Sequence, residues 1–229
     1  MSIKELSLGA LSLTFASSLC LAKDLKPTGF KAAYSLQIDT DEIKTVSACA
    51  AAGDVTVSDS RTETAVGERS DEDSPDRKSP ISMAGDAIGW VKRGFEEVSH
   101  QASLQLALAG KPEVSLSLAR IWIVEVTSFN AEYDGRVVVD VSVLPAGGGM
   151  ACWSERMEGT AENYGRPGKE ANYQETVNHA LDRAFAKTLG SGEFLKALCS
   201  CGASGSSASS PAAARELSTR PRFVRLDRS

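Results

Sequence analysis

Two stretches of the chain carry apolar residues at helical spacing. The first stripe comprises Ile88, Val91, Phe95 and Val98. The second comprises Tyr173, Val177, Leu181, Ala184 and Thr188. Steps of three and four residues place such side chains on one face of a helix. The pattern therefore predicts helices over 84–108, with Ser82 as the N-cap, and over 170–189, with a short helical turn at 194–198 after the second.

Other stretches alternate apolar and polar residues, which is typical of strands. The expected strands cover residues 33–38, 54–59, 114–128, 137–143 and 150–162. In the third of these, alternation places Trp122 and Val124 on the same face as Leu116. Both faces are apolar around 121–124, which indicates a central strand that is covered on both sides.

Turn-forming residues separate these elements. Asp134-Gly135 predicts a turn, and the Pro-Ala-Gly-Gly-Gly run at 145–149 predicts a turn or open loop. The stretch 60–80 is acidic, contains two prolines and has no periodicity, so we expect an exposed loop there. The element order predicts an α+β fold with two layers, in which two helices cover one face of a mainly antiparallel sheet.

The first 22 residues have the composition of an export signal. Lys4 precedes an apolar run from Leu6 to Leu21, and the small residue Ala22 follows it. The run is shorter than a membrane span needs, whereas it fits a secretory signal peptide cleaved after Ala22. A buried N-terminal helix is the structural alternative. Lipid attachment at Cys20 is disfavoured because the bulky Leu19 precedes that cysteine.

Removal of the signal leaves four cysteines, Cys49, Cys152, Cys199 and Cys201. An even number in an exported chain is compatible with disulfides, and the sequence leaves their pairing open. A bond within Cys199-Ser200-Cys201 would close a strained small ring, which favours long-range bonds. Free buried cysteines are the structural alternative.

Composition limits the classes of function. With 42% apolar and 24% charged residues the chain is globular in composition, and its net charge of −5 argues against a nucleic-acid-binding protein. We expect one domain over 23–202. The tail 203–229 is rich in Ser and Ala and is expected to be disordered. Its five arginines exceed its two acidic residues, so it is either a solvated extension or an arm that contacts an acidic partner or lipid headgroups.

A search for catalytic motifs finds none. The chain has no nucleophile elbow, zinc-protease motif, phosphate-binding loop or dinucleotide fingerprint. We therefore predict no catalytic, cofactor-binding or metal-binding residues. His100 and His179, the two histidines, fall in helices without paired ligand spacing. Glu125 and Asp140 on neighbouring strands suggest a carboxylate-based hydrolase. A solvent-facing pair that contacts Arg120 or Arg136 across the sheet is the structural alternative.

The segment after the strand at 54–59 combines Asp59, Arg61 and Gly67. We interpret it as structural: Asp59 and Arg61 form a polar contact that ends the strand, and Gly67 permits a tight reversal. Together with Val55 and Val57 this segment resembles the opening of the YajG-type group of bacterial envelope lipoproteins, and the later order of elements is similar over about 46–198. The resemblance implies a periplasmic location and no known enzymatic activity.

These observations predict a non-enzymatic exported protein of the cell envelope that needs no cofactor. It would be an accessory or binding module with a protein partner and at most peripheral membrane contact. The sheet edge and the 60–80 loop are its expected contact surfaces, by strand addition or loop docking. A secreted effector-like protein and a hydrolase with a carboxylate-based site are the alternatives.

Overall fold

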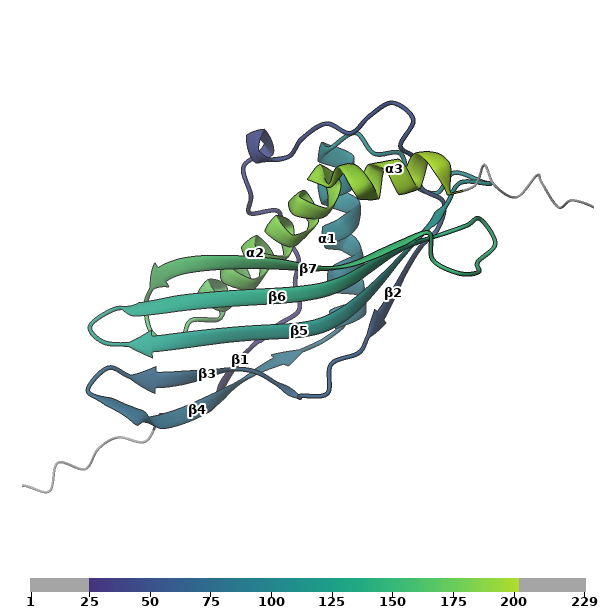
Figure 1. Ribbon diagram of the computed structural model, residues 1–229. Coiled ribbons are helices and arrows are strands. Elements are labelled where there is room, and N and C mark those ends of the chain that lie inside the picture. The colour runs from purple at the N-terminus through teal and green to yellow at the C-terminus, as the bar shows by residue number, and fades with distance from the viewer. Residues whose placement is uncertain (1–24, 202–229) are drawn as a thin grey trace, which may run out of the picture.

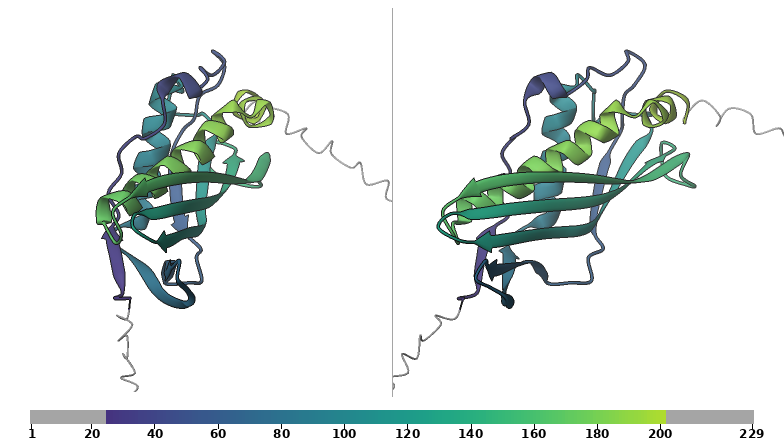
Figure 2. Two further views of the ribbon diagram at one scale, coloured as in Figure 1. Left: turned by 90° about the vertical axis from the view of Figure 1, so that its left-hand side faces the viewer. Right: turned by 60° about the vertical axis from the view of Figure 1, so that its left-hand side comes forward.

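The computed structural model describes residues 25–201 (Figure 1). One face of a curved, seven-stranded sheet is covered by helices, and the opposite face is open (Figures 1 and 2). The strands are β1 (Thr28–Lys31), β2 (Val55–Asp59), β3 (Ala65–Asp71), β4 (Ser74–Ala84), β5 (Glu113–Thr127), β6 (Ala131–Leu144) and β7 (Trp153–Gly165). The helices are α1 (Ala87–Gln101), α2 (Glu170–Gly190) and α3 (Gly192–Ser200), with a 3-10 turn at Thr40–Glu42.

The α+β class and the mainly antiparallel sheet are confirmed, although the sheet also contains parallel pairs and is therefore mixed rather than purely antiparallel. Its strand order is β1-β4-β3-β5-β6-β7, with β2 also paired to β5. The pairs β3–β4, β5–β6 and β6–β7 are antiparallel, whereas β1–β4, β2–β5 and β3–β5 are parallel. The connection through β4 and α1 brings the chain back to begin β5 beside β2, and a crossover of this kind is what parallel neighbours require.

A β-bulge in β5 changes which residues face the helices. The register against β6 shifts between Leu118 and Arg120, so one extra residue, Ala119, reverses the alternation from there on. Leu116 and Leu118 before the bulge are buried, and so are Ile121 and Ile123 after it. The expectation that Trp122 shares the face of Leu116 is therefore wrong. Trp122 is half-exposed on the open face, so the strand is not covered on both sides.

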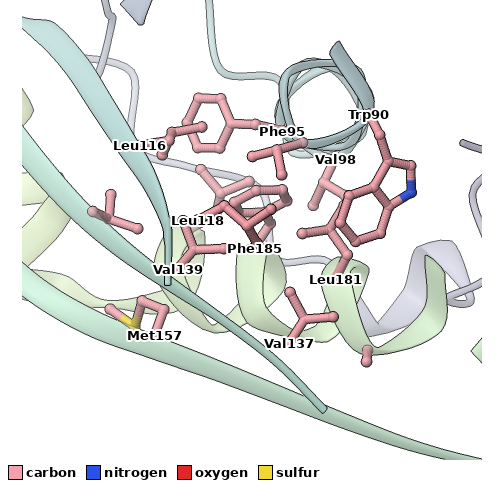
Figure 3. Packing of buried hydrophobic residues seen from close by; sticks show 14 of the residues in the cluster. Trp90, Phe95, Val98, Leu116, Leu118, Val137, Val139, Met157, Leu181 and Phe185 are labelled. Atoms are coloured by element: carbon pink, nitrogen blue, oxygen red, sulfur yellow. The ribbon is translucent and has the colours of Figure 1, made fainter. Parts of the chain in front are cut away.

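The core lies between the sheet and the helices (Figure 3). Phe95 from α1 packs edge-on against Phe185 from α2, with ring centroids 5.2 Å apart. Helix α2 approaches the sheet closely because of Gly159 in β7. A Cβ atom at that position would lie 1.8 Å from the carbonyl oxygen of Ala180, so only glycine fits this contact.

The helices at 84–108 and 170–189 are found as α1 and α2, with shifted ends for the first. Asp86, not Ser82, caps α1, and its carboxylate accepts a hydrogen bond from Gly89 N at 2.8 Å. The predicted final turn at 194–198 is the longer helix α3.

Two sequence-based expectations about loops are wrong. The stretch 60–80 is largely the β3–β4 hairpin rather than a loop. Much of the hairpin lies at the margin of the sheet, so its residues are largely polar. Its strands therefore lack the apolar alternation that predicts a strand. Asp134-Gly135 lies inside β6, and the turn before that strand is at 128–130. Gly135 is required there because a Cβ would lie 2.5 Å from Thr176 Cγ2 of α2.

The predicted signal peptide at 1–22, with Cys20 and the cleavage site after Ala22, lies outside the described residues. The same is true of the tail at 203–229. Both remain predictions from the sequence. In the part of the chain that the structure does describe, no helix is long and apolar enough to cross a membrane.

Candidate functional site

Asp59 and Arg61 lie where β2 ends. The Asp59 carboxylate accepts hydrogen bonds from Arg61 Nε at 2.9 Å, from Nη2 at 2.7 Å and from the backbone N–H of Arg61 at 3.1 Å. These hydrogen bonds lower the pKa of Asp59. Gly67 does not form a reversal. It lies in β3 at a register shift, where a Cβ would lie 2.1 Å from the carbonyl oxygen of Ile123. Its role is to let β3 pair closely with β5.

Glu125 is fully buried among polar partners. Its Oε1 accepts hydrogen bonds from Thr127 Oγ1 at 3.1 Å and from Gly168 N at 2.8 Å. Its Oε2 accepts from the Tyr173 hydroxyl and lies 3.2 Å from Arg69 Nε. Burial, followed by the bond to this carboxylate, raises the pKa of Tyr173 far above its usual value. With both oxygens bonded and the side chain unexposed, Glu125 links β3, β5 and α2 rather than facing a substrate.

Asp140 is remote from Glu125, so the two do not form a catalytic pair. Asp140 accepts hydrogen bonds from Arg156 Nε at 2.7 Å and Nη2 at 2.8 Å. These bonds lower its pKa. The residue opposite Glu125 on β6 is Tyr133, which is about 23 Å from Asp140 along the strand at roughly 3.3 Å per residue. Glu125 also points toward the helices, whereas Asp140 lies on the open face. Glycosidase-type chemistry needs carboxylates less than about 10 Å apart.

Side chains four residues apart on α2 bind the segment 31–38, an interaction that the sequence analysis did not find. Glu170 accepts a hydrogen bond from Lys31 N at 2.9 Å, and Gln174 Nε2 donates to Lys31 O at 3.2 Å. One turn further on, Asn178 Nδ2 donates to Ala33 O at 3.1 Å, and its Oδ1 accepts from Trp90 Nε1 at 2.7 Å. Beyond β1, residues 33–38 have no strand partner in the described part of the chain, and side chains of α2 bond to part of their backbone instead.

Asp182 completes this row and is fully buried. It accepts hydrogen bonds from the Tyr34 hydroxyl at 2.6 Å and from the backbone N–H groups of Gln37 at 2.7 Å and Ile38 at 3.3 Å. Burial raises the pKa of Asp182 even though these three donors favour its charged form. The alternation at 33–38 that suggested a strand therefore arises from packing against α2. The spacing Glu170, Gln174, Asn178 and Asp182 was the available signal.

The histidines do not form a metal site. Within residues 25–201 no group of three or more His, Cys, Asp or Glu side chains is arranged to hold a metal ion. His100 is exposed on α1. His179 is half-buried on α2, where burial, and then the charge of Arg183, lower its pKa.

The four cysteines of the described chain form two long-range disulfides. Cys49 is bonded to Cys199 with a Cα–Cα distance of 5.4 Å, and Cys152 to Cys201 with one of 5.9 Å. Both bonds join the end of α3 to loops at the same end of the sheet. The two disulfides hold the end of α3 in place. Phe194 of α3 also packs edge-on against Trp153, with 5.4 Å between the ring centroids. Chains with such bonds are typical of oxidising compartments.

The open face of the sheet carries a hollow of about 770 Å³ next to Trp122. Its floor comes from β5, β6 and β7, and the side chain of Arg183 from α2 reaches its margin around the edge of β7. The lining residues are Trp122, Val124, Asp134, Gly135, Arg136, Thr160, Ala161, Glu162, Tyr164 and Arg183. A half-exposed Trp next to Tyr and Arg is the composition enriched where proteins bind one another.

Charges of both signs surround this hollow. Arg120 lies over the Trp122 ring, 5.2 Å from its centroid. Arg136 forms an ion pair with Glu158 at 2.5 Å. At the other end, partial burial and the charges of Glu132 and Glu162 raise the pKa of Asp134. The surface can therefore form charge-assisted hydrogen bonds with either sign of partner group, but it contains no nucleophile held by a base.

Comparison with known proteins does not assign this chain to a family. No family model matches it, and no curated protein matches it. A crystal structure of a Xanthomonas campestris protein of the DUF330 family is similar with a TM-score of 0.42 and 10% identity, over 71% of this chain and 93% of that one. A Caulobacter crescentus protein described as a "putative lipoprotein" gives a TM-score of 0.36 and 16% identity, over 51% of this chain and 88% of that one.

Proposed function

We propose that this protein is an exported, non-enzymatic accessory protein of the cell envelope that binds another envelope protein through the hollow around Trp122. The observation that carries the binding role is this hollow, an open, aromatic and charged surface on the side of the sheet that the described helices leave uncovered. Rigid strands floor it, so the anchor side chains are held in place before a partner arrives, which lowers the entropic cost of binding.

The location outside the cytoplasm rests on two independent features. The first is the leader at 1–22 with a small residue before Lys23. The second is the pair of disulfides Cys49–Cys199 and Cys152–Cys201, which cross-link distant segments and persist in oxidising compartments.

A non-enzymatic role fits the way the buried ionisable groups are used. Glu125 accepts bonds from three hydroxyl or amide donors and lies next to Arg69. Asp182 accepts three bonds that hold the segment 34–38. These interactions support the fold, and the separation of Glu125 from Asp140 removes the reason for considering a carboxylate-based hydrolase.

Site-specific photo-crosslinking in the native host tests the binding surface. A photoreactive amino acid replaces Thr160, an exposed residue in the hollow, and a second strain carries it at Glu175, which is exposed on α2. We expect a discrete adduct with another envelope protein from position 160 and none from position 175. Trp122→Ala should abolish the adduct, whereas Met150→Ala, which removes a 90% exposed apolar side chain elsewhere, should not.

An adduct at position 160 that survives Trp122→Ala would contradict the assignment of the hollow, as would equal labelling from both positions. Cell fractionation with the intact mass of the purified protein tests the location separately. The expected chain starts at Lys23 and lacks two hydrogens for each disulfide. A cytosolic chain that starts at Met1 would refute export.

A further inference from the structure

Most free edges of the sheet are closed by other parts of the chain. Along β7, the Arg183 guanidinium donates to the Thr160 carbonyl at 2.9 Å and the Lys187 ammonium to the Glu158 carbonyl at 2.8 Å. Along β1, side chains of α2 bond both backbone groups of Lys31. Charged side chains on edge backbone groups are a common protection against unwanted pairing.

The exposed part of β4 is protected in another way. Strand β1 pairs only with Ile81–Ala84, which leaves the first part of β4 as an edge. This part contains Pro75 and Pro80, and proline has no N–H to offer an added strand.

Strand β2 has neither form of protection. Within residues 25–201 it pairs only with β5, and no other strand lies along its second edge. Val114 N bonds to Asp54 O, and Ser60 N bonds to Leu118 O. Since alternate residues of a parallel strand face the same neighbour, the N–H and C=O groups of Val55, Val57 and Asp59 face away from β5. The strand contains no proline or lysine.

A second surface adjoins the start of β2. The segment that follows α1 bonds to the residues just before the strand, through Ala107 N to Gly53 O and Leu108 N to Ala52 O, both at 3.1 Å. Between this segment and α1 is a hollow of about 610 Å³. It is lined by Glu96, His100, Ser103, Leu104, Gln105, Leu106 and Leu108. An extended chain that pairs with β2 thus has apolar contacts and a carboxylate at one end of the strand.

We propose that the C-terminal segment Arg222–Leu226 of this chain adds as a strand to the open edge of β2. Its sequence, Arg-Phe-Val-Arg-Leu, alternates, favours strands and follows Pro221, so the proline precedes the paired residues. Val224 and Leu226 project to the same face of such a strand. They would extend the apolar layer of Val55 and Val57, which pack against the core.

The chain is long enough and leaves the domain at the right place. Cys201 Sγ lies 4.0 Å from the carbonyl of Val143. Val143 is paired with Val114 of β5, which in turn is paired with Val55 of β2. Two strand spacings therefore separate the exit of the tail from the start of β2, about 10 Å across the sheet. Twenty residues, 202–221, lie between Cys201 and the proposed strand, and a chain of that length can reach at most about 66 Å, more than the separation requires.

Charge also favours this occupant. Residues 203–229 contain Arg215, Arg220, Arg222, Arg225 and Arg228 against Glu216 and Asp227, a net charge of +3. Asp54 precedes β2, and Glu96 lies in the adjoining hollow, both exposed. The covalent link keeps the segment at an effective concentration in the millimolar range, so a short strand suffices for binding.

Residue-resolved amide hydrogen exchange by NMR tests the proposal on the full mature chain. Val224→Pro removes an N–H in the centre of the added strand, and Ala213→Pro is the matched control outside it. In the unaltered chain and in Ala213→Pro, we expect the amides of Val55 and Val57 to be protected. In Val224→Pro they should exchange roughly tenfold faster. The amides of Thr56 and Ser58, which bond to β5, should not change.

Equal exchange of Val55 and Val57 in all three chains would overturn the proposal. Loss of their protection on dilution of the unaltered chain would assign the edge to a second copy and overturn the tail as occupant. An equal acceleration at Thr56 and Ser58 in Val224→Pro would show an effect on the whole strand and would also refute pairing at the outer edge.

Discussion

The two disulfides differ in the length of chain that they close, and this difference predicts an order of stabilities. Cys49–Cys199 spans 150 residues and Cys152–Cys201 spans 49. In the chain-entropy description, loops of these lengths restrict the unfolded state by about 5 and about 4 kcal/mol. The difference, (3/2)RT ln(150/49) with the separations above, is about 1 kcal/mol.

The perturbation is paired replacement by alanine, which leaves the other disulfide intact. Alanine is preferable to serine because Cys201 is buried, and a hydroxyl there would add the cost of an unbonded polar group. Nesting of the two bonds reduces the difference to about 0.7 kcal/mol, because with Cys152–Cys201 closed the shortest path from Cys49 to Cys199 runs over about 106 residues.

Urea denaturation followed by tryptophan fluorescence measures the effect, since Trp153 lies beside Phe194 of the cross-linked helix. We expect Cys49→Ala/Cys199→Ala to lose about 0.7 kcal/mol more unfolding free energy than Cys152→Ala/Cys201→Ala. A larger loss from the 49-residue cross-link would refute the reasoning from loop length. Losses below about 0.5 kcal/mol for both pairs would show that the bonds do not constrain the unfolded chain.

Three other substitutions test the packing and the buried carboxylates. Gly159→Ala should lower the unfolding free energy by about 3 kcal/mol because its Cβ would collide with the Ala180 carbonyl. Gly190→Ala, with no atom within 4 Å of the added Cβ, should stabilise α2 by up to about 1 kcal/mol. Thermal melts in which Gly159→Ala and Gly190→Ala change the stability equally would contradict both predictions. Folding raises the pKa of Asp182, so its contribution to stability is greatest at low pH and decreases as the pH rises from the unfolded value near 3.8 through the folded one. The difference in urea stability between the unaltered chain and Asp182→Asn should therefore shrink between pH 3 and pH 7, and a difference that grows would have the opposite sign to the one predicted.

Local pattern was sufficient where a single face decides the structure. Helix α2 and strand β6 each bury one regular row of side chains, such as Val177 and Leu181 or Val139 and Val141. Their apolar positions repeat with the period of the element itself. The element type, its approximate bounds and the α+β class could be predicted from the sequence for this reason.

The pattern failed where a distant segment supplies the partners. The Ala119 bulge places Trp122, and with it the residues of the hollow, on the open face. The sequence pattern did not predict this because an inserted residue leaves no mark in composition. The segment 33–38 alternates like a strand, yet its backbone bonds to Asn178 and to Asp182, more than a hundred residues away. Those bonds are not local, so no short window of sequence contains both partners.

The sequence by itself determined the number of cysteines, the leader composition, the two main helices and the central strands. Only the tertiary structure decided the cysteine pairing, the burial of Glu125 and the unpaired edge of β2. These depend on which segments meet across the sheet, and that choice minimises the free energy of the whole chain rather than of any one segment. Hydrophobic periodicity fixes which side of an element faces inward, whereas the identity of its neighbour is a global property.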